Sequence, residues 1–492
     1  MSSVTFYDTL NALRDDHLAD YIVTKIFNGV RADLSETDRH ASQNKKKFID
    51  SVLQLYDCET SPTLHDKSNN VHVQVEALMT AQKIKSISCI EFLSEDDDIF
   101  PVAIKNTTLD HKKNKNVLCS AQQVNIQKAR LAYACNALGK SCGFIVGNGN
   151  KWGLVDFENE DANHMRIAKK AADWAHLFKE THIEMSIDPP SCEELYPNMK
   201  VATKDCNIQQ YKKKLALKNN EMTLIRYIGT KQRSIALYNG ITSWKDPRLN
   251  AKLIGFKTKK VTDKHGEITA VPNGAIVDTI LKANQNTSFP KQVRPRPHCC
   301  NEKDIFLDIE TLLNTDCPDI PDYVFMIGVG YVENGEDKFV CLRAEEITLE
   351  EELKITKQFL DLVQRLNAAR TLHWGQFEEK VFKKVGERHR IQINSQLNLF
   401  DMCKYIERND YCPRGSFNFS LKSIVPAMYK HKLISTIWDS ECTDGNEAAV
   451  RAFHAYKNGV VDVLNDIKEY NKIDVVSTMD IWKYLVSIGI LM

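Results

Sequence analysis

The sequence predicts a multidomain α/β protein, and three observations indicate this class. The chain has 492 residues, enough for two to four domains of ordinary size, and 43% of them are hydrophobic, so several cores can be filled. Short apolar runs that are typical of buried strands alternate with segments of helical periodicity. A stretch with three prolines, residues 288–297, excludes a helix and favours an extended linker before a last domain.

The N-terminal part, residues 1–195, has the mixed pattern of an α/β domain. Apolar residues recur at helical spacing in three segments, the last of them amphipathic, and two short apolar runs predict strands that are buried in a sheet. The predicted helices cover residues 10–27, 48–56 and 121–138, and the predicted strands cover residues 100–105 and 142–147.

The middle of the chain, residues 196–286, is predicted to be a basic helical segment. Its lysines suit a surface that binds nucleic acid, but lysines on the solvated face of a helix explain the same pattern. We place the linker at residues 287–302 and the last domain at residues 303–492. The lysines in question are Lys212, Lys213, Lys214, Lys218, Lys252, Lys257, Lys259, Lys260 and Lys264.

The composition favours an intracellular protein, but it does not identify the ligand. Lys and Arg together number 65, as do Asp and Glu, and this balance does not exclude nucleic acid because binding depends on where the basic residues lie. The 14 cysteines form no C-x-x-C pair, which favours reduced thiols in an intracellular protein. No apolar run reaches the length of a membrane span, and the N-terminus lacks the pattern of a signal peptide. We therefore expect a soluble protein with no membrane partner, cytoplasmic or nuclear.

Two carboxylates in the first strand of the last domain are the strongest functional signal. The run 304–310 (DIFLDIE) predicts a buried strand, and residues 324–330 predict its hairpin partner. Asp308 and Glu310 are two apart, so their side chains point to the same face of the strand. Two buried carboxylates on one face repel each other, and a pair of divalent cations would offset that cost.

Further acids follow at intervals along the last domain. Residues 373–378 (HWGQFE) end on Glu378, after a helix that we expect at residues 351–369, and Asp401 precedes another helix. Tyr470 and Asp474 are four apart in the C-terminal helix and so share one of its faces.

This order of motifs resembles the DEDD exonucleases of the DnaQ-like superfamily, in the tyrosine variant that ends on Y-x-x-x-D. The details resemble most the ribonuclease H-like domains that are fused to RecB-family nucleases. Residues 373–378, the L-K-S-I segment at 421–424 and residues 444–449 match those domains. The resemblance implies a mixed sheet with flanking helices for residues 303–492.

The resemblance also implies roles for single residues. Asp308, Glu310, Glu378 and Asp474 would bind two Mg²⁺ or Mn²⁺ ions, and Tyr470 would orient the attacking water. Position 378 departs from the family, which usually has Asp there, and Asp401 is the reserve ligand. In the L-K-S-I segment, Lys422 would contact nucleic acid.

The N-terminal part resembles the RecB-like branch of PD-(D/E)XK nucleases. In that family a strand ends in an acid, any residue and a lysine, and here Lys105 takes the lysine position while Ala103 takes that of the acid. Glu91 is the candidate for the upstream acid, and Gln127 and Tyr133 lie on the helix that follows. Because alanine cannot bind a metal, the resemblance implies a degenerate, inactive site, although Lys105 is equally an ordinary lysine at a strand end.

The middle segment resembles the helix–hairpin–helix-like segment between the two nuclease domains of the same fused family. Residues 222–245 predict two helices, each ended by a glycine turn. Gly229 would let backbone N–H groups approach a phosphate, and Lys231 and Arg233 would add charge. A small packing module with surface lysines explains these residues equally well.

Two functions of different class follow. The first is a metal-dependent 3′→5′ exonuclease that hydrolyses phosphodiester bonds at single-stranded ends of DNA or RNA, with its polarity implied by the resemblance alone. The second is a nucleic-acid-binding or scaffold protein that keeps both nuclease folds without full catalysis. The complete acid set favours the enzyme, whereas Ala103 and Glu378 favour the scaffold.

Overall fold

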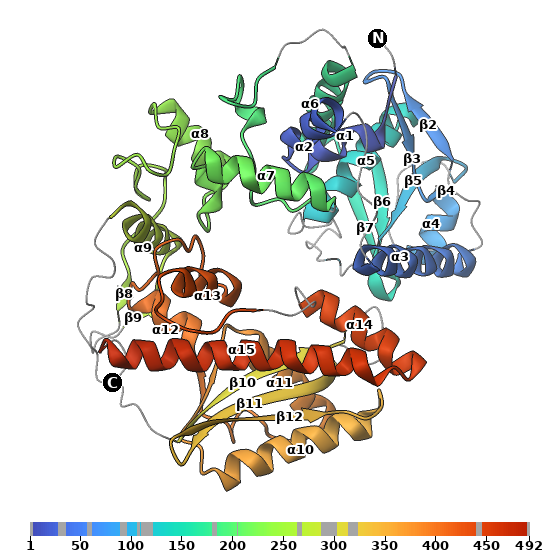
Figure 1. Ribbon diagram of the computed structural model, residues 1–492. Helices are drawn as coiled ribbons and strands as arrows, with labels where there is room; N and C mark the ends of the chain where they lie inside the picture. The colour runs from blue at the N-terminus through green and yellow to red at the C-terminus, as the bar shows by residue number, and fades with distance from the viewer. Residues whose placement is uncertain are drawn as a thin grey trace. The chain divides into compact units, whose positions relative to one another are not determined.

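The computed structural model describes residues 3–27, 36–56, 62–88, 96–105, 109, 122–179, 185–203, 205–262, 268–286, 303–312, 323–438 and 445–489. The chain divides into two compact units, Met1–Glu221 and Met222–Met492 (Figure 1). Within the described residues, no helix combines the length and the apolar character that crossing a membrane requires.

The first unit is built on two sheets, with helices packed against them. Its larger sheet has the strand order β4-β5-β6-β7, in which β5 and β6 are parallel and the other neighbours antiparallel. Its smaller sheet has the order β1-β3-β2. The strands are β1 (Val4–Thr5), β2 (Thr63–Asp66), β3 (Val71–Gln74), β4 (Ala77–Thr80), β5 (Ile99–Ile104), β6 (Cys142–Val146) and β7 (Trp152–Asp156). The longer helices are α1 (Phe6–Leu13), α3 (Glu36–Leu55), α5 (Gln122–Leu138), α6 (Ala162–Lys179) and α7 (Cys206–Lys218).

All three helices predicted for the first unit differ from the expectation. The one predicted at residues 48–56 is the end of α3, which begins at Glu36. The helix predicted at residues 10–27 is broken, because Asp15 adopts a left-handed φ of 60° between α1 and the short helix α2 (His17–Tyr21). Helix α5 is buried on nearly every side instead of being amphipathic, since it contacts strands of both sheets as well as α6. The two predicted strands are confirmed as β5 and β6.

The second unit contains a five-stranded mixed sheet of order β12-β11-β10-β13-β14. β10, β11 and β12 are antiparallel neighbours, so the predicted hairpin is confirmed, whereas β13 and β14 continue the sheet in parallel with β10. The strands are β10 (Asp304–Thr311), β11 (Val324–Glu333), β12 (Glu336–Arg343), β13 (Arg370–His373) and β14 (Leu399–Asp401). The helices used below are α10 (Leu349–Arg365), α11 (Phe377–His389), α12 (Met402–Arg408), α13 (Leu421–Lys430), α14 (Gly445–Asn458) and α15 (Val461–Ser487).

Side chains of β10 alternate between the two faces of this sheet. Ile305, Leu307 and Ile309 enter the core that α10 and α11 complete, whereas Phe306 enters the core that α15 contributes to. Figure 1 shows α10 and α15 on opposite faces of the sheet. Asp308 therefore lies on the face that α15 covers.

The middle segment is divided between the two units. Helix α7 belongs to the first unit, where Lys212 is fully buried in an ion pair with Asp16, 2.6 Å between Nζ and Oδ2. This lysine is thus a structural group and not part of a basic surface. Residues 222–286 belong to the second unit and share a hydrophobic core with the sheet and α15. In place of the first of the two predicted helices, they begin with a 3₁₀ turn at Met222–Leu224. Helix α8 (Thr230–Tyr238) and later α9 (Asn273–Gln285) follow. The predicted linker lies outside the described residues.

Candidate active site

Asp308 and Glu310 bring two carboxylates into the interior on the α15 face of β10. In the register with β11 they lie opposite Gly328 and Met326. Burial and then the charges of Asp474, Glu310 and Glu378 raise the pKa of Asp308 well above its usual range. Burial and the charge of Asp474 do the same to the pKa of Glu310. Ionising both groups is thus unfavourable in this site unless positive charge is supplied.

Glu378 and Asp474 complete the acidic cluster from two helices. Glu378 lies in the first turn of α11, directly after β13, and is buried. Asp474 lies on α15, and burial raises its pKa to about 6, against the effects of hydrogen bonds and of Lys422. The structure therefore brings together the four acids that the motifs singled out, from β10, α11 and α15.

All four carboxylates already accept a hydrogen bond from a protein donor or face a ring nitrogen, and Glu310 does so through Asn471. Asn471 donates to Asp308 and Trp438 to Asp474, each over 2.7 Å, while Nδ1 of His373 lies 3.3 Å from Oε2 of Glu378. Within the described part of the chain, no three His, Cys, Asp or Glu side chains already stand in an arrangement that could hold a metal ion. The donors themselves fit Mg²⁺ or Mn²⁺, which prefer carboxylate oxygens, but the carboxylates must move closer together to surround an ion.

Asn471 is a site residue that the sequence motifs did not reveal. It lies between Tyr470 and Asp474 on α15, is fully buried, and has a side-chain oxygen without a hydrogen-bond partner. Its amide sits where a side chain of Gly328 would be, since a Cβ at that glycine would lie 1.9 Å from Asn471 Oδ1. A signal was present: glycines at positions 328 and 330, on one face of a buried strand, indicate close approach of another backbone.

We expect Gly328→Ala to lower the free energy of unfolding by about 1–3 kcal/mol, because the new methyl group displaces Asn471 from β10. Gly445→Ala is the matched control, since nothing lies within 4 Å of a Cβ at that position. Urea unfolding of both variants would measure the effect. Equal stability of Gly328→Ala and the wild type would contradict the close contact.

Tyr470 and Lys422 stand beside the acids. Tyr470 is only 3% exposed, packs in the core and forms a side-chain hydrogen bond with Asp474. Lys422, an exposed residue in the first turn of α13, places its Nζ 5.0 Å from the centre of the Tyr470 ring. Its charge lowers the pKa of both Glu310 and Asp474, which locates it at the edge of the cluster.

Asp401, the reserve ligand, has a structural place. It is the N-cap of α12, where its Oδ1 accepts from the backbone N–H of Lys404 and of Gly375, each over 3.1 Å. It does not appear among the main charges that shift the pKa of Asp308, Glu310 or Asp474.

The candidate phosphate site at α8 is already capped by the protein. The backbone N–H of Gly229 donates to the side chain of Gln232 over 3.1 Å, within a capping box. Arg233 is buried at 3% exposure, and Lys231 is exposed. Of these predicted contacts, Lys231 alone presents its side chain to solvent.

In the first unit, the region predicted to hold a degenerate nuclease site contains an ion pair between Glu76 and Arg130. Lys105 follows β5 and Ala103 is fully buried, while Glu91 lies outside the described residues. The acid that the motifs missed is Glu76, in the apolar run before β4. It accepts a hydrogen bond from the backbone of Ile104 over 3.2 Å and two from Arg130 Nη1 over 2.8 and 2.9 Å.

The other two residues of this region have structural contacts. Gln127 accepts a hydrogen bond from Arg130 over 3.3 Å, and the Tyr133 hydroxyl donates to the carbonyl of Ala168 over 2.5 Å. The region is thus satisfied by its own hydrogen bonds and ion pair.

A comparison with protein families indicates the class of protein to which the acidic site of the second unit belongs. Residues 305–486 match the family model of the RNase H superfamily. The C-terminal domain is RNase H-like. The match runs from β10 to the last turns of α15 and so includes all four acids and Tyr470. No curated protein matches the chain. An RNase H-like domain indicates a nuclease that acts on nucleic acids, and nucleases of this class generally use divalent metal ions.

Proposed function

We propose that the RNase H-like domain is a metal-dependent 3′→5′ exonuclease that hydrolyses single-stranded ends of DNA or RNA. The observation that carries this proposal is the convergence of Asp308, Glu310, Glu378 and Asp474 from β10, α11 and α15, with mutual charge effects on their pKa values. Four carboxylates held so close in a buried site are costly unless cations join them.

Each residue of the cluster has a defined part in the proposed reaction. Two divalent cations, when bound, would neutralise the scissile phosphate and lower the pKa of the attacking water. The four carboxylates would hold these ions, and Asn471 would keep Asp308 in place. The Tyr470 hydroxyl would orient the water, and Lys422 at the edge of the cluster would meet a phosphate oxygen.

Incubation of the full chain with end-labelled single strands tests the proposal. With a 5′ label and Mg²⁺ or Mn²⁺ we expect a ladder of shortening products, and with a 3′ label the immediate release of mononucleotide. EDTA should stop both reactions, and DNA and RNA strands run side by side identify the substrate. Intact strands in every metal condition would overturn the proposal in favour of a scaffold that only binds nucleic acid.

The first unit supports a second, narrower proposal: a degenerate nuclease fold of the PD-(D/E)XK type that serves binding or architecture. Ala103 supplies no ligand, and Glu76 is neutralised by Arg130 over 2.8 Å. A carboxylate that is saturated by a guanidinium has little affinity left for a metal ion.

Lys105→Ala should therefore leave hydrolysis by the full chain within about twofold of the wild type, because Ala103 supplies no ligand and Glu76 is paired with Arg130. Rates on end-labelled strands, compared at matched protein concentration, check this expectation. A loss of most hydrolysis with unchanged strand binding would mean that the first unit is catalytic.

A further inference from the structure

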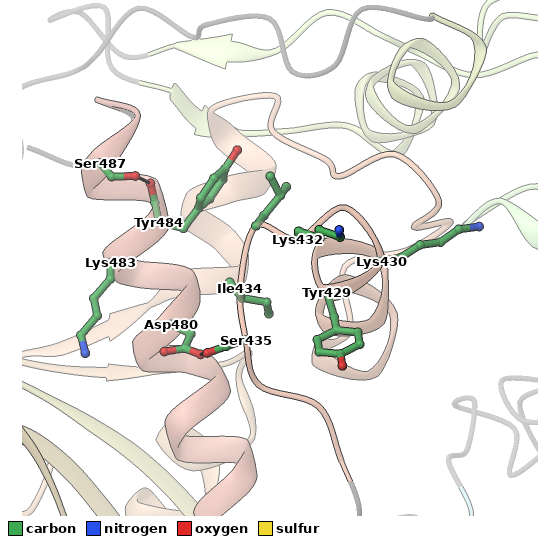
Figure 2. Close-up of a pocket in the computed structure, with 10 residues that line it drawn as sticks. Tyr429, Lys430, Lys432, Ile434, Ser435, Asp480, Lys483, Tyr484 and Ser487 are labelled. Atoms are coloured by element: carbon green, nitrogen blue, oxygen red, sulfur yellow. Dashed lines mark hydrogen bonds between the residues drawn. The ribbon is translucent and has the colours of Figure 1, made fainter.

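A groove of about 830 Å³ lies in the second unit between the end of α13 and the last turns of α15. Residues 432–435, which follow α13, form its floor. Figure 2 shows the Tyr484 ring between the two helices and the Lys432 side chain over the end of α13, while Lys430 and Lys483 extend away from the groove on opposite sides. Its volume lies in the range of sites that bind small ligands or parts of a larger chain.

The charge of this groove favours an anionic ligand. Its acid, Asp480, is occupied as an acceptor for the hydroxyl groups of Thr436 and Ser435. Lys483 is paired with Asp337 over 2.5 Å. Lys430 and Lys432 are exposed, and neither forms an ion pair with a carboxylate in the described ranges. Asp480 keeps its negative charge while it accepts these hydrogen bonds, so the lining carries two cations, Lys430 and Lys432, against one carboxylate, a net positive charge.

The groove also offers aromatic surface. The ring of Tyr429 is 42% exposed at one wall, and Tyr484 is half-buried at the other, packed on Tyr411. Lysines interleaved with exposed aromatic rings are the combination that binds single strands without reading sequence: cations hold phosphates and rings stack on bases.

The same segments of the chain border the groove and the acid site. Residues 432–438 run from the groove to the acids, because Ser435 and Thr436 are tied to Asp480 and Trp438 donates to Asp474 over 2.7 Å. The two helical walls make the same connection. Helix α13 carries Lys422 at its other end, and α15 carries Asp474 three turns before Tyr484.

We propose that the α13–α15 groove binds the sugar–phosphate backbone and bases of the single strand whose 3′ end lies at the four acids. This inference rests on the proposed function for the position of the strand end. Lys430 and Lys432 contact phosphates, and Tyr429 and Tyr484 stack on bases. The contacts are made to groups that every nucleotide carries, so the groove sets affinity and not sequence preference.

Fluorescence anisotropy of a labelled 20-nucleotide single strand, with the full chain in EDTA, tests the groove without any hydrolysis. The double variant Lys430→Ala, Lys432→Ala should raise Kd about tenfold and reduce the slope of log Kd against log salt by about 1.4, the loss of two phosphate contacts. Tyr429→Ala should raise Kd about tenfold, and Tyr429→Phe, which keeps the ring, should restore binding.

The matched control is Lys357→Ala, Lys383→Ala, which removes two exposed lysines from α10 and α11 on the other face of the sheet. A Kd for the groove variant equal to that of the wild type, or an equal loss in the control, would overturn the groove. A wild type that binds no strand would also overturn the proposal, and a protein ligand for the groove would then be the alternative.

The outcome is separate from that of the proposed function. A wild type that binds strands through Lys430 and Lys432 but hydrolyses none would retain the groove and refute the exonuclease.

Discussion

Asp308→Asn is expected to reduce metal-dependent hydrolysis at least 10³-fold while the fold stays intact. Asp308 feels the charges of all three other acids, so it is the carboxylate best placed to share both cations, and its loss removes the template for the ions. Initial rates on end-labelled strands in Mg²⁺ and in Mn²⁺ measure the effect. Asp361→Asn, an exposed carboxylate on α10, is the matched control and should be as active as the wild type.

The same substitution should raise stability in the absence of metal. Burial and like charge raise the pKa of Asp308 and Glu310 above their usual values and that of Asp474 from 3.8 to about 6. Acids with raised pKa values in the folded state retain protons that the unfolded chain releases. Their contribution to the free energy of unfolding is therefore full below about pH 4 and is lost as pH rises through 6 and above.

Asp308→Asn removes one of these buried charges. In EDTA at pH 8 its Tm should therefore exceed that of the wild type, and the difference should shrink as the pH is lowered to 5. Thermal unfolding followed by circular dichroism at both pH values checks the sign. A variant that is less stable than the wild type at pH 8 would mean that Asp308 is a structural acceptor for Asn471 first and a charged ligand second.

Tyr470→Phe is expected to lower turnover by about 10²–10³ with little change in strand affinity, as for a lost group that positions a reactant. The substitution keeps the ring that packs in the core and removes only the hydroxyl that bonds Asp474. Single-turnover rates and anisotropy on the same strand separate chemistry from binding.

Tyr456→Phe is the control for the loss of a structural hydroxyl. That phenol donates to the carbonyl of Ala344 over 2.7 Å, so its removal should cost about 1 kcal/mol of stability and no turnover. If Tyr470→Phe behaves in the same way, Tyr470 is a packing residue, and the assignment to the tyrosine variant rests on spacing alone.

The parts of the site that could be predicted from the sequence are those that depend on the spacing of residues within a single strand or helix. Asp308 and Glu310 sit two apart in an apolar run, which places them on one face of a strand, and Tyr470 and Asp474 sit one turn apart in a helix. Of the strands of the mixed sheet, β10 and β11 followed from such runs, whereas β12, β13 and β14 were not predicted from the residues.

The parts that escaped prediction depend on contacts between distant segments. No local pattern marks Asn471 as a site residue. Its role depends on the packing of α15 against β10, where Gly328 leaves space for its side chain and Asp308, 163 residues away, accepts its hydrogen bond. Glu76 is similar, since Arg130, its partner, lies on another element. Helix α5 looked amphipathic because periodicity shows one apolar face, and it does not show that a second sheet covers the other.

Helix α15 runs unbroken for 27 residues, and this length has a consequence for the proposed digestion. Asp474 and Tyr484 are ten residues apart on it, so about 15 Å separates the cutting point from the aromatic of the groove, at 1.5 Å per residue. Stacked nucleotides advance by about 3.4 Å, so that span corresponds to roughly four of them. Because the helix has a fixed length, it would fix the distance between the acids and the groove. A strand shorter than this distance would no longer reach the groove while its 3′ end lies at the acids, so degradation would leave a product of about four nucleotides.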